Sequence, residues 1–383
     1  MKIGIVTYWK STDNYGEQLQ NYALQEYLRG LGHEPFLIRY DYEADTIYGS
    51  KPLPVRLLRA CNPKRLARYF RSRRNNRMYA KNCLEHPRGF EDFRKEHLSM
   101  SRVYSSIGDL RNDPPEADMY ITGSDQVWNT FGAEFSEMQN RLSAFFLDFG
   151  GEDIKRVSYA ASWGRKSLPD VEKSFLKPLL AKFNAVSVRE DTGIEVCSGL
   201  GRNDAVQAYD PILLHGAEKY RQLYRINGFS IPEEKYLLFY FMNNDGKFDR
   251  KAVFDYARSK GLKVMYVTDD WHSGLERSFP GVTEWIGLLD HAEYVVTNSF
   301  HCAVFSLIFE KKFGVIKRFG SHNGMNTRMD SLFETLGVQP RYIDDSGFEI
   351  LDRPADKLGV KAMNAAKRPE DVIGIALKTH EAG

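Results

Sequence analysis

The stretch at residues 294–316 reads YVVTNSFHCAVFSLIFEKKFGVI, and its pattern decides the fold. Residues 294–296 are an apolar run of strand length, and residues 303–309 are an apolar run that we expect to form a buried helix. Residues 313–316 predict a second strand. A strand, a helix and a strand in this order form a βαβ unit, which predicts parallel strands in one sheet.

The same alternation extends over most of the chain. In the first half, strands are predicted at residues 2–7, 35–39, 118–122, 156–160 and 185–188, and a helix at 17–29. In the second half, further strands are predicted at 236–241 and 263–267, and a helix at 250–260. Near-continuous apolar runs are typical of strands covered on both faces. We therefore predict an α/β fold of two Rossmann-like domains with mostly parallel sheets that face a cleft.

The length of 383 residues also favours two domains, because a single core rarely grows to that size. Residues 210–234 contain two prolines and two glycines around a short helical pattern, which is typical of a connector. We place the boundary at residue 225, between domains 1–225 and 226–383. A last helix at 369–380 is expected to pack back on the first domain.

Composition excludes several classes of protein. The net charge of +2 gives no reason to expect a nucleic-acid partner. No apolar run reaches the length of a membrane-spanning helix, and the first residues lack the pattern of a secretory signal, so we expect a cytoplasmic protein. The four cysteines lack metal-ligand spacing. We expect free thiols, and we predict neither a metal site nor a cofactor. The cysteines are Cys61, Cys83, Cys197 and Cys302.

A basic insertion occupies residues 46–84. It contains no acid, and residues 51–81 carry eleven lysines and arginines interleaved with leucine and aromatic residues. This mixture suits a helix on an anionic lipid surface, where each base contributes about 1 kcal/mol. An exposed basic helix with an ordinary solvated face is the alternative, and a grip on an anionic substrate is a third interpretation. Contact with lipid would place the protein at the inner face of the membrane and predict a lipid-linked acceptor.

Candidate site residues follow the predicted strands, because ligands of open parallel sheets bind beyond the carboxyl ends of the strands. The turn after the first strand could hold an anion or merely cap a helix, and the later turns combine polar groups with tryptophans, as sugar sites and packed loops both do. The first half supplies Asp13, Asn14, Tyr15, Gly16, Ser124, Asp125, Trp128, Ser162, Trp163 and Arg189. The second half supplies Ser299, His301, Lys317, Arg318 and Arg328.

Arg189 and His301 carry the strongest chemical signal. Arg189 ends a buried strand, and its planar guanidinium matches a carboxylate or a phosphate, with an ion pair to Glu190 or Asp191 as the structural alternative. His301 follows a strand at the start of a helix, where anions bind, and it can carry a proton near neutral pH. Capping or packing is the alternative for a single histidine.

Taken in order, these segments resemble the polysaccharide pyruvyl transferase family over roughly residues 3–341. The resemblance depends on the order of several short motifs. They are Asn14-Tyr15-Gly16 with Leu19-Gln20 and Ala23-Leu24, Gly123-Ser124-Asp125-Gln126-Val127-Trp128, Ser158-Tyr159-Ala160-Ala161-Ser162, Ser187-Val188-Arg189-Glu190, Asp210-Pro211 and Thr297-Asn298-Ser299-Phe300-His301.

The resemblance implies a fold similar to two-domain glycosyltransferases of the GT-B type, with the acceptor on the first domain and the donor on the second. It implies transfer of an enolpyruvyl unit from phosphoenolpyruvate to a galactose- or mannosamine-type sugar, which gives a pyruvate ketal in surface polysaccharide (exopolysaccharide) biosynthesis. Arg189 and His301 are implied to hold the donor. Many members carry Ser-Arg-x-His where this chain has Asn298-Ser299-Phe300-His301, so Lys317, Arg318 and Arg328 are candidates for the missing charge.

The chemistry assigns provisional roles to the candidates. Phosphoenolpyruvate reacts at C2 when its methylene carbon is protonated, which calls for a proton donor, cations and a base for the sugar hydroxyl. We assign proton transfer to His301 and hydroxyl activation to Asp13 or Asp125. The donor-binding set is Arg189, Ser299, Lys317, Arg318 and Arg328, and the acceptor-binding set is Asn14, Tyr15, Gly16, Ser124, Trp128, Ser162 and Trp163.

Two other functions fit the same sequence. A nucleotide-sugar glycosyltransferase would share the architecture, because a fold does not decide the donor. A non-catalytic binding protein of a polysaccharide assembly pathway is the other alternative, since Ser299 stands where arginine is common. Titration with phosphoenolpyruvate and with nucleotide sugars distinguishes the pyruvyl transferase from a nucleotide-sugar glycosyltransferase. Phosphate release that depends on the acceptor excludes a non-catalytic binding protein.

Overall fold

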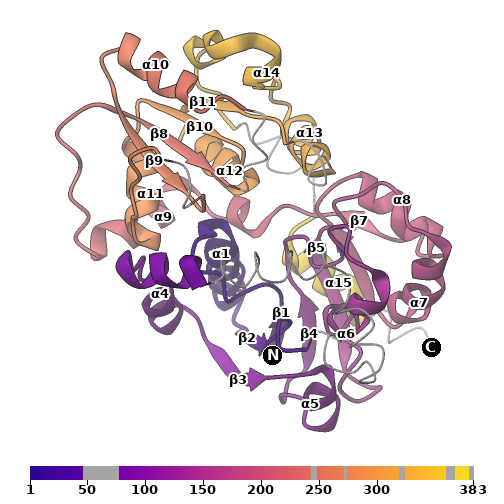
Figure 1. Cartoon of the computed structure of the whole chain (residues 1–383). Helices are drawn as coiled ribbons and strands as arrows, with labels where there is room; N and C mark the ends of the chain where they lie inside the picture. Colours follow the sequence, from indigo (N-terminus) through magenta and orange to yellow (C-terminus); the bar gives the residue numbers. More distant parts are fainter. Residues whose placement is uncertain (46–76, 243–247, 271–273, 319–323, 359–366, 379–383) are drawn as a thin grey trace, which may run out of the picture.

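The computed structural model describes residues 1–45, 77–242, 248–270, 274–318, 324–358 and 367–378 (Figure 1). Most of the basic insertion therefore lies outside the described residues, and its predicted contact with lipid stays a prediction. No helix among the described residues has both the length and the apolar character needed to span a bilayer. Cys83, Cys197 and Cys302 are free thiols, while Cys61 falls outside the described ranges.

Among the described residues, the first half of the chain builds a seven-stranded sheet whose neighbouring strands are all parallel, in the order β3-β2-β1-β4-β5-β6-β7. Its strands are β1 (Lys2–Val6), β2 (Glu34–Tyr40), β3 (Met100–Tyr104), β4 (Met119–Thr122), β5 (Lys155–Ala161), β6 (Ala185–Val188) and β7 (Val206–Gln207). Its helices are α1 (Tyr15–Gly30), α4 (Phe90–His97), α5 (Ile107–Asn112), α6 (Phe135–Phe145), α7 (Asp170–Ala181) and α8 (Thr192–Gly199).

The second half builds a four-stranded parallel sheet in the order β11-β10-β8-β9. The short helix η2 (Pro211–Leu214) and α9 (Ala217–Ile226) join the two sheets. The strands are β8 (Tyr236–Phe241), β9 (Lys263–Thr268), β10 (Tyr294–Thr297) and β11 (Lys312–Val315). The helices are α10 (Lys251–Ser259), α11 (Val282–His291), α12 (Phe300–Ile308), α13 (Gly324–Leu336), α14 (Ile343–Ser346), η4 (Gly347–Asp352) and α15 (Pro369–Lys378).

These two parallel sheets confirm the predicted α/β class. The strands β6 and β8 have the predicted bounds, and the other predicted strands differ by one or two residues at their ends. The helix after β10 begins at Phe300, before the predicted start at residue 303, because the Ser299 side chain accepts a hydrogen bond from the Cys302 amide and caps the helix. The short strands β3 and β7 were not predicted.

The two halves share apolar packing. Helix α1 lies between the sheets (Figure 1), and the ring of its first residue, Tyr15, stacks on Trp285 of α11 with centroids 5.0 Å apart. Tyr15 also donates a hydrogen bond to the carbonyl of Pro280. At the other end of the chain, α15 contacts β5 and β6 of the first sheet, and its Val372 joins the core beneath them. The boundary at residue 225 stays a prediction.

Candidate functional site

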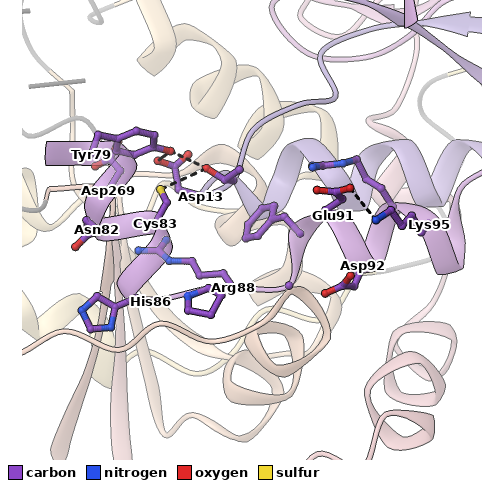
Figure 2. Close-up of a pocket in the computed structure, with 15 residues that line it drawn as sticks. Asp13, Tyr79, Asn82, Cys83, His86, Arg88, Glu91, Asp92, Lys95 and Asp269 are labelled. Atoms are coloured by element: carbon purple, nitrogen blue, oxygen red, sulfur yellow. Dashed lines mark hydrogen bonds and ion pairs between the residues drawn. The ribbon is translucent and has the colours of Figure 1, made fainter. Parts of the chain in front are cut away.

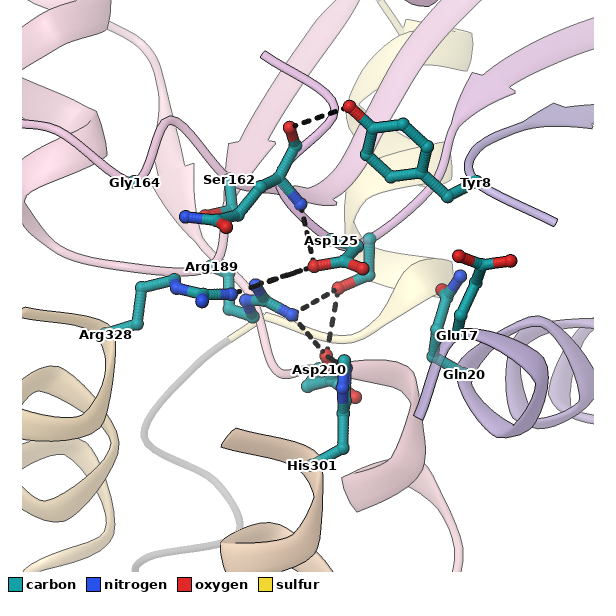
Figure 3. A network of polar contacts seen from close by, with 12 residues as sticks. Tyr8, Glu17, Gln20, Asp125, Ser162, Gly164, Arg189, Asp210, His301 and Arg328 are labelled. Atoms are coloured by element: carbon teal, nitrogen blue, oxygen red, sulfur yellow. Dashed lines mark hydrogen bonds and ion pairs between the residues drawn. The ribbon is translucent and has the colours of Figure 1, made fainter. Parts of the chain in front are cut away.

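Polar side chains from both sheets meet where their strands end (Figure 3). In the first half, Asp125 follows β4, Arg189 follows β6 and Asp210 follows β7. In the second half, His301 lies in the first turn of α12, directly after β10. The sequence put Asp125, Arg189 and His301 after predicted strands, and the parallel sheets bring these strand ends together.

Asp210 is the centre of this network. Its side chain is fully buried, and its Oδ2 lies 2.9 Å from Arg189 Nη1, 3.0 Å from Ser124 Oγ and 3.4 Å from His301 Nε2. Burial alone raises the pKa of a carboxyl group, but the charges of His301 and Arg189 hold the pKa of Asp210 far below its usual range. Asp210 is therefore a buried carboxylate that fixes Arg189 of the first half and the His301 imidazole of the second half.

Arg189 is held from three sides. Besides Asp210, its guanidinium approaches Asp125 Oδ1 at 3.5 Å, and it lies 4.4 Å from the centroid of the Phe300 ring in α12. Burial lowers the pKa of Arg189, but Asp210 and Asp125 outweigh it and raise that pKa above the ordinary value. Glu190, the expected alternative partner of Arg189, instead accepts hydrogen bonds from Ser162 Oγ and from the backbone amides of Trp163 and Gly164.

Asp125 occupies a backbone conformation that is uncommon for its type. Its φ of 85° lies in the left-handed region, and its carbonyl accepts a hydrogen bond from the Ser162 amide. Strained residues of this kind persist where surrounding contacts fix them, and they cluster at functional sites. Burial raises the pKa of Asp125, yet Arg189 and His301 lower it overall, so the carboxylate stays ionised beside the cations.

Arg328 of α13 brings a second guanidinium to the same place. Its Nη1 lies 3.7 Å from Asp125 Oδ1, and the guanidinium lies 5.6 Å from the centroid of the Phe300 ring. Burial and the charge of Arg189 lower the pKa of Arg328 to about 9. The two buried arginines thus share one ring and the Asp125 carboxylate, while Asp210 pairs with Arg189 alone of the two.

Three nitrogen atoms of this network are buried without a hydrogen-bond partner among the described residues. They are Arg189 Nε, Arg328 Nε and His301 Nε2, which lies at ion-pair rather than hydrogen-bond geometry to Asp210. A buried donor without a partner costs about 1–3 kcal/mol, so such groups call for an acceptor. Two of these nitrogens belong to guanidinium groups and the third to an imidazole, and together they fit an anion.

The His301 ring packs against the start of α1. A Cβ atom on Gly16 would lie 2.2 Å from His301 Nδ1, so only glycine leaves room for the imidazole. The neighbouring Asn14 caps α1 by accepting a hydrogen bond from the Glu17 amide. Gly16 thus belongs to the site through its contact with His301, not through its backbone conformation.

The structure does not bring the other candidates to the network in the expected way. Trp128 and Trp163 lie in the core with no exposed ring face, and their centroids are 4.9 Å apart. Their placement corrects the expectation that they cover a sugar, because a ring stacks on a ligand only where it is exposed. Tyr15 is likewise buried against Trp285. Ser124 and Ser162 are buried and support Asp210 and Glu190.

The predicted donor-binding cations that follow β11, Lys317 and Arg318, have different partners in the structure. Lys317 forms an ion pair of 2.6 Å with Asp345, so its charge is already compensated there, which argues against its predicted role in donor binding. Arg318 donates from Nε to the Asn298 carbonyl at 2.9 Å and lines a small space with Phe300 and Arg328. Arg328, another of the expected substitutes for the missing arginine, lies 3.7 Å from Asp125 Oδ1.

Glu17 is a site residue that the sequence did not reveal. It lies in the first turn of α1 and points toward the network (Figure 3), and its Oε1 accepts a hydrogen bond from the Ser11 amide at 2.8 Å. Burial, together with the charges of Asp125 and Asp13, raises the pKa of Glu17 from 4.5 to about 8 despite that hydrogen bond. In the sequence, the position of Glu17 after a polar turn is typical of a residue that caps the helix.

Glu17→Gln is expected to remove part of the pH dependence of the protein's stability. Because the folded state holds the Glu17 proton up to about pH 8, the wild type loses stability as pH rises from 4.5 to about 8, and the glutamine variant lacks this loss. The melting temperature of the variant relative to the wild type should therefore rise over that interval and stay level above it. Glu116→Gln, at an exposed carboxylate, is the control; a constant difference across the interval contradicts the prediction.

Comparison with known proteins identifies the family. The family model described as polysaccharide pyruvyl transferase matches residues 14–318. The chain belongs to this family. The match includes Asp125, Arg189, Asp210 and His301, while Arg328 lies beyond it. A search of the curated proteins finds no significant match.

Solved structures with similar chains include three that contain UDP or UDP-GlcNAc. The N. meningitidis UDP-GlcNAc 2-epimerase bound to UDP-GlcNAc has a TM-score of 0.48 and 8% identity, over 99% of this chain and 100% of that one. S. aureus MnaA with UDP has a TM-score of 0.46 and 9% identity, over 94% and 93%. An α-glucosyltransferase with UDP and DNA has a TM-score of 0.42 and 9% identity, over 93% and 96%. Likeness at this level assigns no substrate to this pyruvyl transferase family member.

Proposed function

We propose that the protein transfers an enolpyruvyl unit from phosphoenolpyruvate to a sugar and closes it to a pyruvate ketal. One observation carries the proposal: Arg189, Arg328 and His301, from both halves of the chain, meet around Asp125 and Asp210, and each keeps a buried nitrogen without a hydrogen-bond partner. Phosphoenolpyruvate has two anionic groups close together, which match two guanidinium groups and an imidazole. Membership of the family supports the same reaction.

In this proposal Arg189 and Arg328 hold the carboxylate and the phosphate. His301 gives a proton to the methylene carbon while a sugar hydroxyl adds to C2 and passes its own proton to Asp125. The C2–O bond to phosphate then breaks, and Asp125 returns its proton to the departing phosphate. A second sugar hydroxyl attacks C2 and gives its proton to His301, so one hydroxyl proton ends on the new methyl group and the other on phosphate.

The two carboxylates have different parts. Asp210 holds Arg189 and His301 in place and is saturated with donors, which makes it a positioning residue. Asp125 is ionised and lies at the Arg189–Arg328 side, so it can accept a proton from an incoming hydroxyl. Asp13 lies at a neighbouring cavity and is assigned to orient the sugar hydroxyls.

The acceptor is proposed to be a galactose- or mannosamine-type sugar on a lipid carrier. Purified protein is incubated with phosphoenolpyruvate and aryl glycosides of both sugar types, and phosphate release and product mass are measured. We expect phosphate release that depends on the acceptor, and a product heavier by one pyruvate less one water. Binding of nucleotide sugars, with no binding of phosphoenolpyruvate, overturns the proposal.

Gly16→Ala is expected to reduce phosphate release by about ten- to a hundredfold, because the new methyl group displaces the His301 ring and misplaced catalytic groups lose activity on that scale. Gly30→Ala is the matched control at the other end of α1, where a Cβ atom would meet nothing within 4 Å. Both variants keep the helix, since alanine is the better helix former. Equal activity of the two variants would show that His301 tolerates displacement.

A further inference from the structure

A cavity of about 280 Å³ lies beside the turn before α1 (Figure 2), whereas the cavity at Arg189 holds only about 20 Å³. Its walls come from that turn, from the helical residues 77–85 with the loop that leads to α4, from the first turns of α4 and from the end of β9. Pockets that bind small molecules begin at about 300 Å³, so this cavity has room for one sugar unit. The turn also connects it with the network, because Gly16 follows Asp13 by three residues and contacts His301.

Hydrogen-bonded polar groups form one wall of the cavity. The Tyr79 hydroxyl donates to Asp13 Oδ2 at 2.8 Å and lies 2.9 Å from Thr12 Oγ1. Ser11 fixes the other carboxylate oxygen, because its hydroxyl donates to Asp13 Oδ1 at 2.9 Å. Asp13 and Tyr79 are only half-buried, so both are held in place and both keep accessible surface. A carboxylate accepts several hydrogen bonds, and a phenol donates and accepts, which suits the hydroxyls of a sugar.

The cations of the lining are occupied elsewhere. Arg88 is 8% exposed, and its Nη2 donates to the last carbonyl of β9 at 2.9 Å. Arg94 is 7% exposed, and its Nη1 donates to the Ser11 carbonyl at 3.0 Å. The exposed Lys95 forms an ion pair of 2.7 Å with Glu91. These three cations are thus directed at carbonyl and carboxylate oxygens of the protein itself.

Carboxylates dominate the charge that faces the cavity. Besides Asp13, the described lining includes Asp92 at the start of α4 and Asp269 directly after β9. No described group of histidine, cysteine and carboxylate side chains could hold a metal ion, so this charge does not mark a metal site. An acidic sugar or a phosphate would meet like charge here, which disfavours its binding. An uncharged sugar instead offers hydroxyl donors to the same carboxylates.

We propose that this cavity binds an uncharged sugar unit of the acceptor through Asp13 and Tyr79, and that its carboxylates exclude acidic sugars and sugar phosphates. The inference rests on the proposed function and names the charge class of the acceptor unit. It divides the substrates between two places: the arginines around Asp125 hold the anionic donor, and the cavity holds the neutral acceptor.

Protection of Cys83 tests the inference without a reaction. This free thiol lines the cavity and is half-buried, while Cys197 and Cys302 are buried. N-ethylmaleimide is added to the wild-type protein, and the rate of Cys83 alkylation is measured by mass analysis of its peptide. Methyl galactoside and methyl N-acetylmannosaminide are expected to slow alkylation about tenfold at ten times their Kd. Methyl galacturonide and galactose 1-phosphate, at the same concentrations, should slow it about twofold or less, because like charge weakens their binding at least about tenfold. Equal protection by neutral and acidic sugars, or no protection by the neutral ones, overturns the inference.

Tyr79→Phe is expected to weaken binding of the neutral glycosides by about tenfold, because the ring stays and the hydroxyl beside Asp13 is lost. Tyr294→Phe is the matched control: Tyr294 also donates to an aspartate, Asp352, at 3.4 Å, but it begins β10 and does not line the cavity. Equal affinity of the two folded variants overturns the role of Tyr79. If Tyr79→Phe does not fold, the protection pattern of the wild type still decides the inference.

Asp92→Asn tests the selection by charge. Asp92 is exposed, so its replacement should leave the fold intact. The variant is expected to bind methyl galacturonide about two- to fivefold more tightly than the wild type, the usual value of one exposed charge, and to bind methyl galactoside equally well. Asp113→Asn is the control, because Asp113 is an exposed carboxylate that pairs with Arg102 and does not line the cavity. No gain in Asp92→Asn, or an equal gain in both variants, contradicts selection by these carboxylates.

Phosphoenolpyruvate separates the two proposals. We expect it to bind the wild type in calorimetry and to leave the alkylation of Cys83 unchanged. Protection of Cys83 by phosphoenolpyruvate alone overturns the inference, since the cavity would then hold the donor. If phosphoenolpyruvate does not bind at all, the proposed function fails, whatever the cavity holds. If it binds and releases phosphate with neutral glycosides that do not protect Cys83, only the inference fails.

Discussion

Replacement of His301 by alanine is expected to slow acceptor-dependent phosphate release by about a hundred- to ten-thousand-fold, the usual contribution of a positioned acid or base. The imidazole has one side against Gly16 and its Nε2 3.4 Å from Asp210, so its orientation is fixed before substrate binds. Alanine removes the only group that we assign to protonating the methylene carbon of phosphoenolpyruvate. Turnover is measured with saturating phosphoenolpyruvate and acceptor, so that the loss reports on chemistry and not on affinity.

His33→Ala serves as the control for this substitution, because His33 lies in the turn between α1 and β2, away from the network. Its turnover should equal that of the wild type. The melting temperature of both variants is measured alongside, since lost activity in an unfolded variant says nothing about mechanism. Unchanged turnover in folded His301→Ala removes the histidine from the reaction.

The sequence predicted the sheets because each central strand is buried on both faces. The runs that became β6 and β8 are buried at every position, and Ser187 in β6 is small enough not to break the apolar pattern, so their ends are well defined. Arg189 and His301 could be chosen for the same reason, as the first chemically capable side chains after such runs. Parallel strands then bring these ends together, which spacing along the chain alone does not reveal.

Asp210 escaped the sequence-based assignment of roles although it organises the network. It follows β7, which has only two residues, both half-buried, and so lacks the apolar run that marks a strand end. Its pairing with Pro211 looked like the start of a connector. Its function became visible only through the contacts of its carboxylate with Arg189 and His301.

The tryptophans show the opposite error. Trp128 and Trp163 stand beside polar residues in the sequence, which is typical of a sugar site, but neighbours in sequence do not fix the direction of a side chain. Both rings turn into the core beneath the site, where Trp128 donates a hydrogen bond to the Phe145 carbonyl. Asp125 and Ser162 of the same loops do contact Arg189 and Glu190, so within each loop the polar residue and the tryptophan point in different directions.

Asp210→Asn is expected to destabilise the folded protein by about 3–5 kcal/mol, the cost of removing one partner from a buried ion pair. The amide keeps the shape and can still accept from Ser124, but it leaves the Arg189 charge, whose side chain is 3% exposed, without its nearest carboxylate. Urea unfolding at pH 7 measures the change as a lower midpoint. Phosphate release should fall as well, because Arg189 and His301 lose their common support.

The pH dependence distinguishes lost charge from lost packing. Since the pKa of Asp210 is lowered on folding, its contribution to stability is complete above the usual carboxyl range and is lost only as pH falls below it. The difference between wild type and Asp210→Asn should therefore stay constant from neutral pH to about pH 5 and shrink only in stronger acid. Asp204→Asn, which breaks a pair whose carboxylate is 58% exposed, should change the free energy of unfolding by about 1 kcal/mol or less. If the two variants unfold at the same urea concentration, Asp210 is not the support on which the convergence of Arg189 and His301 depends.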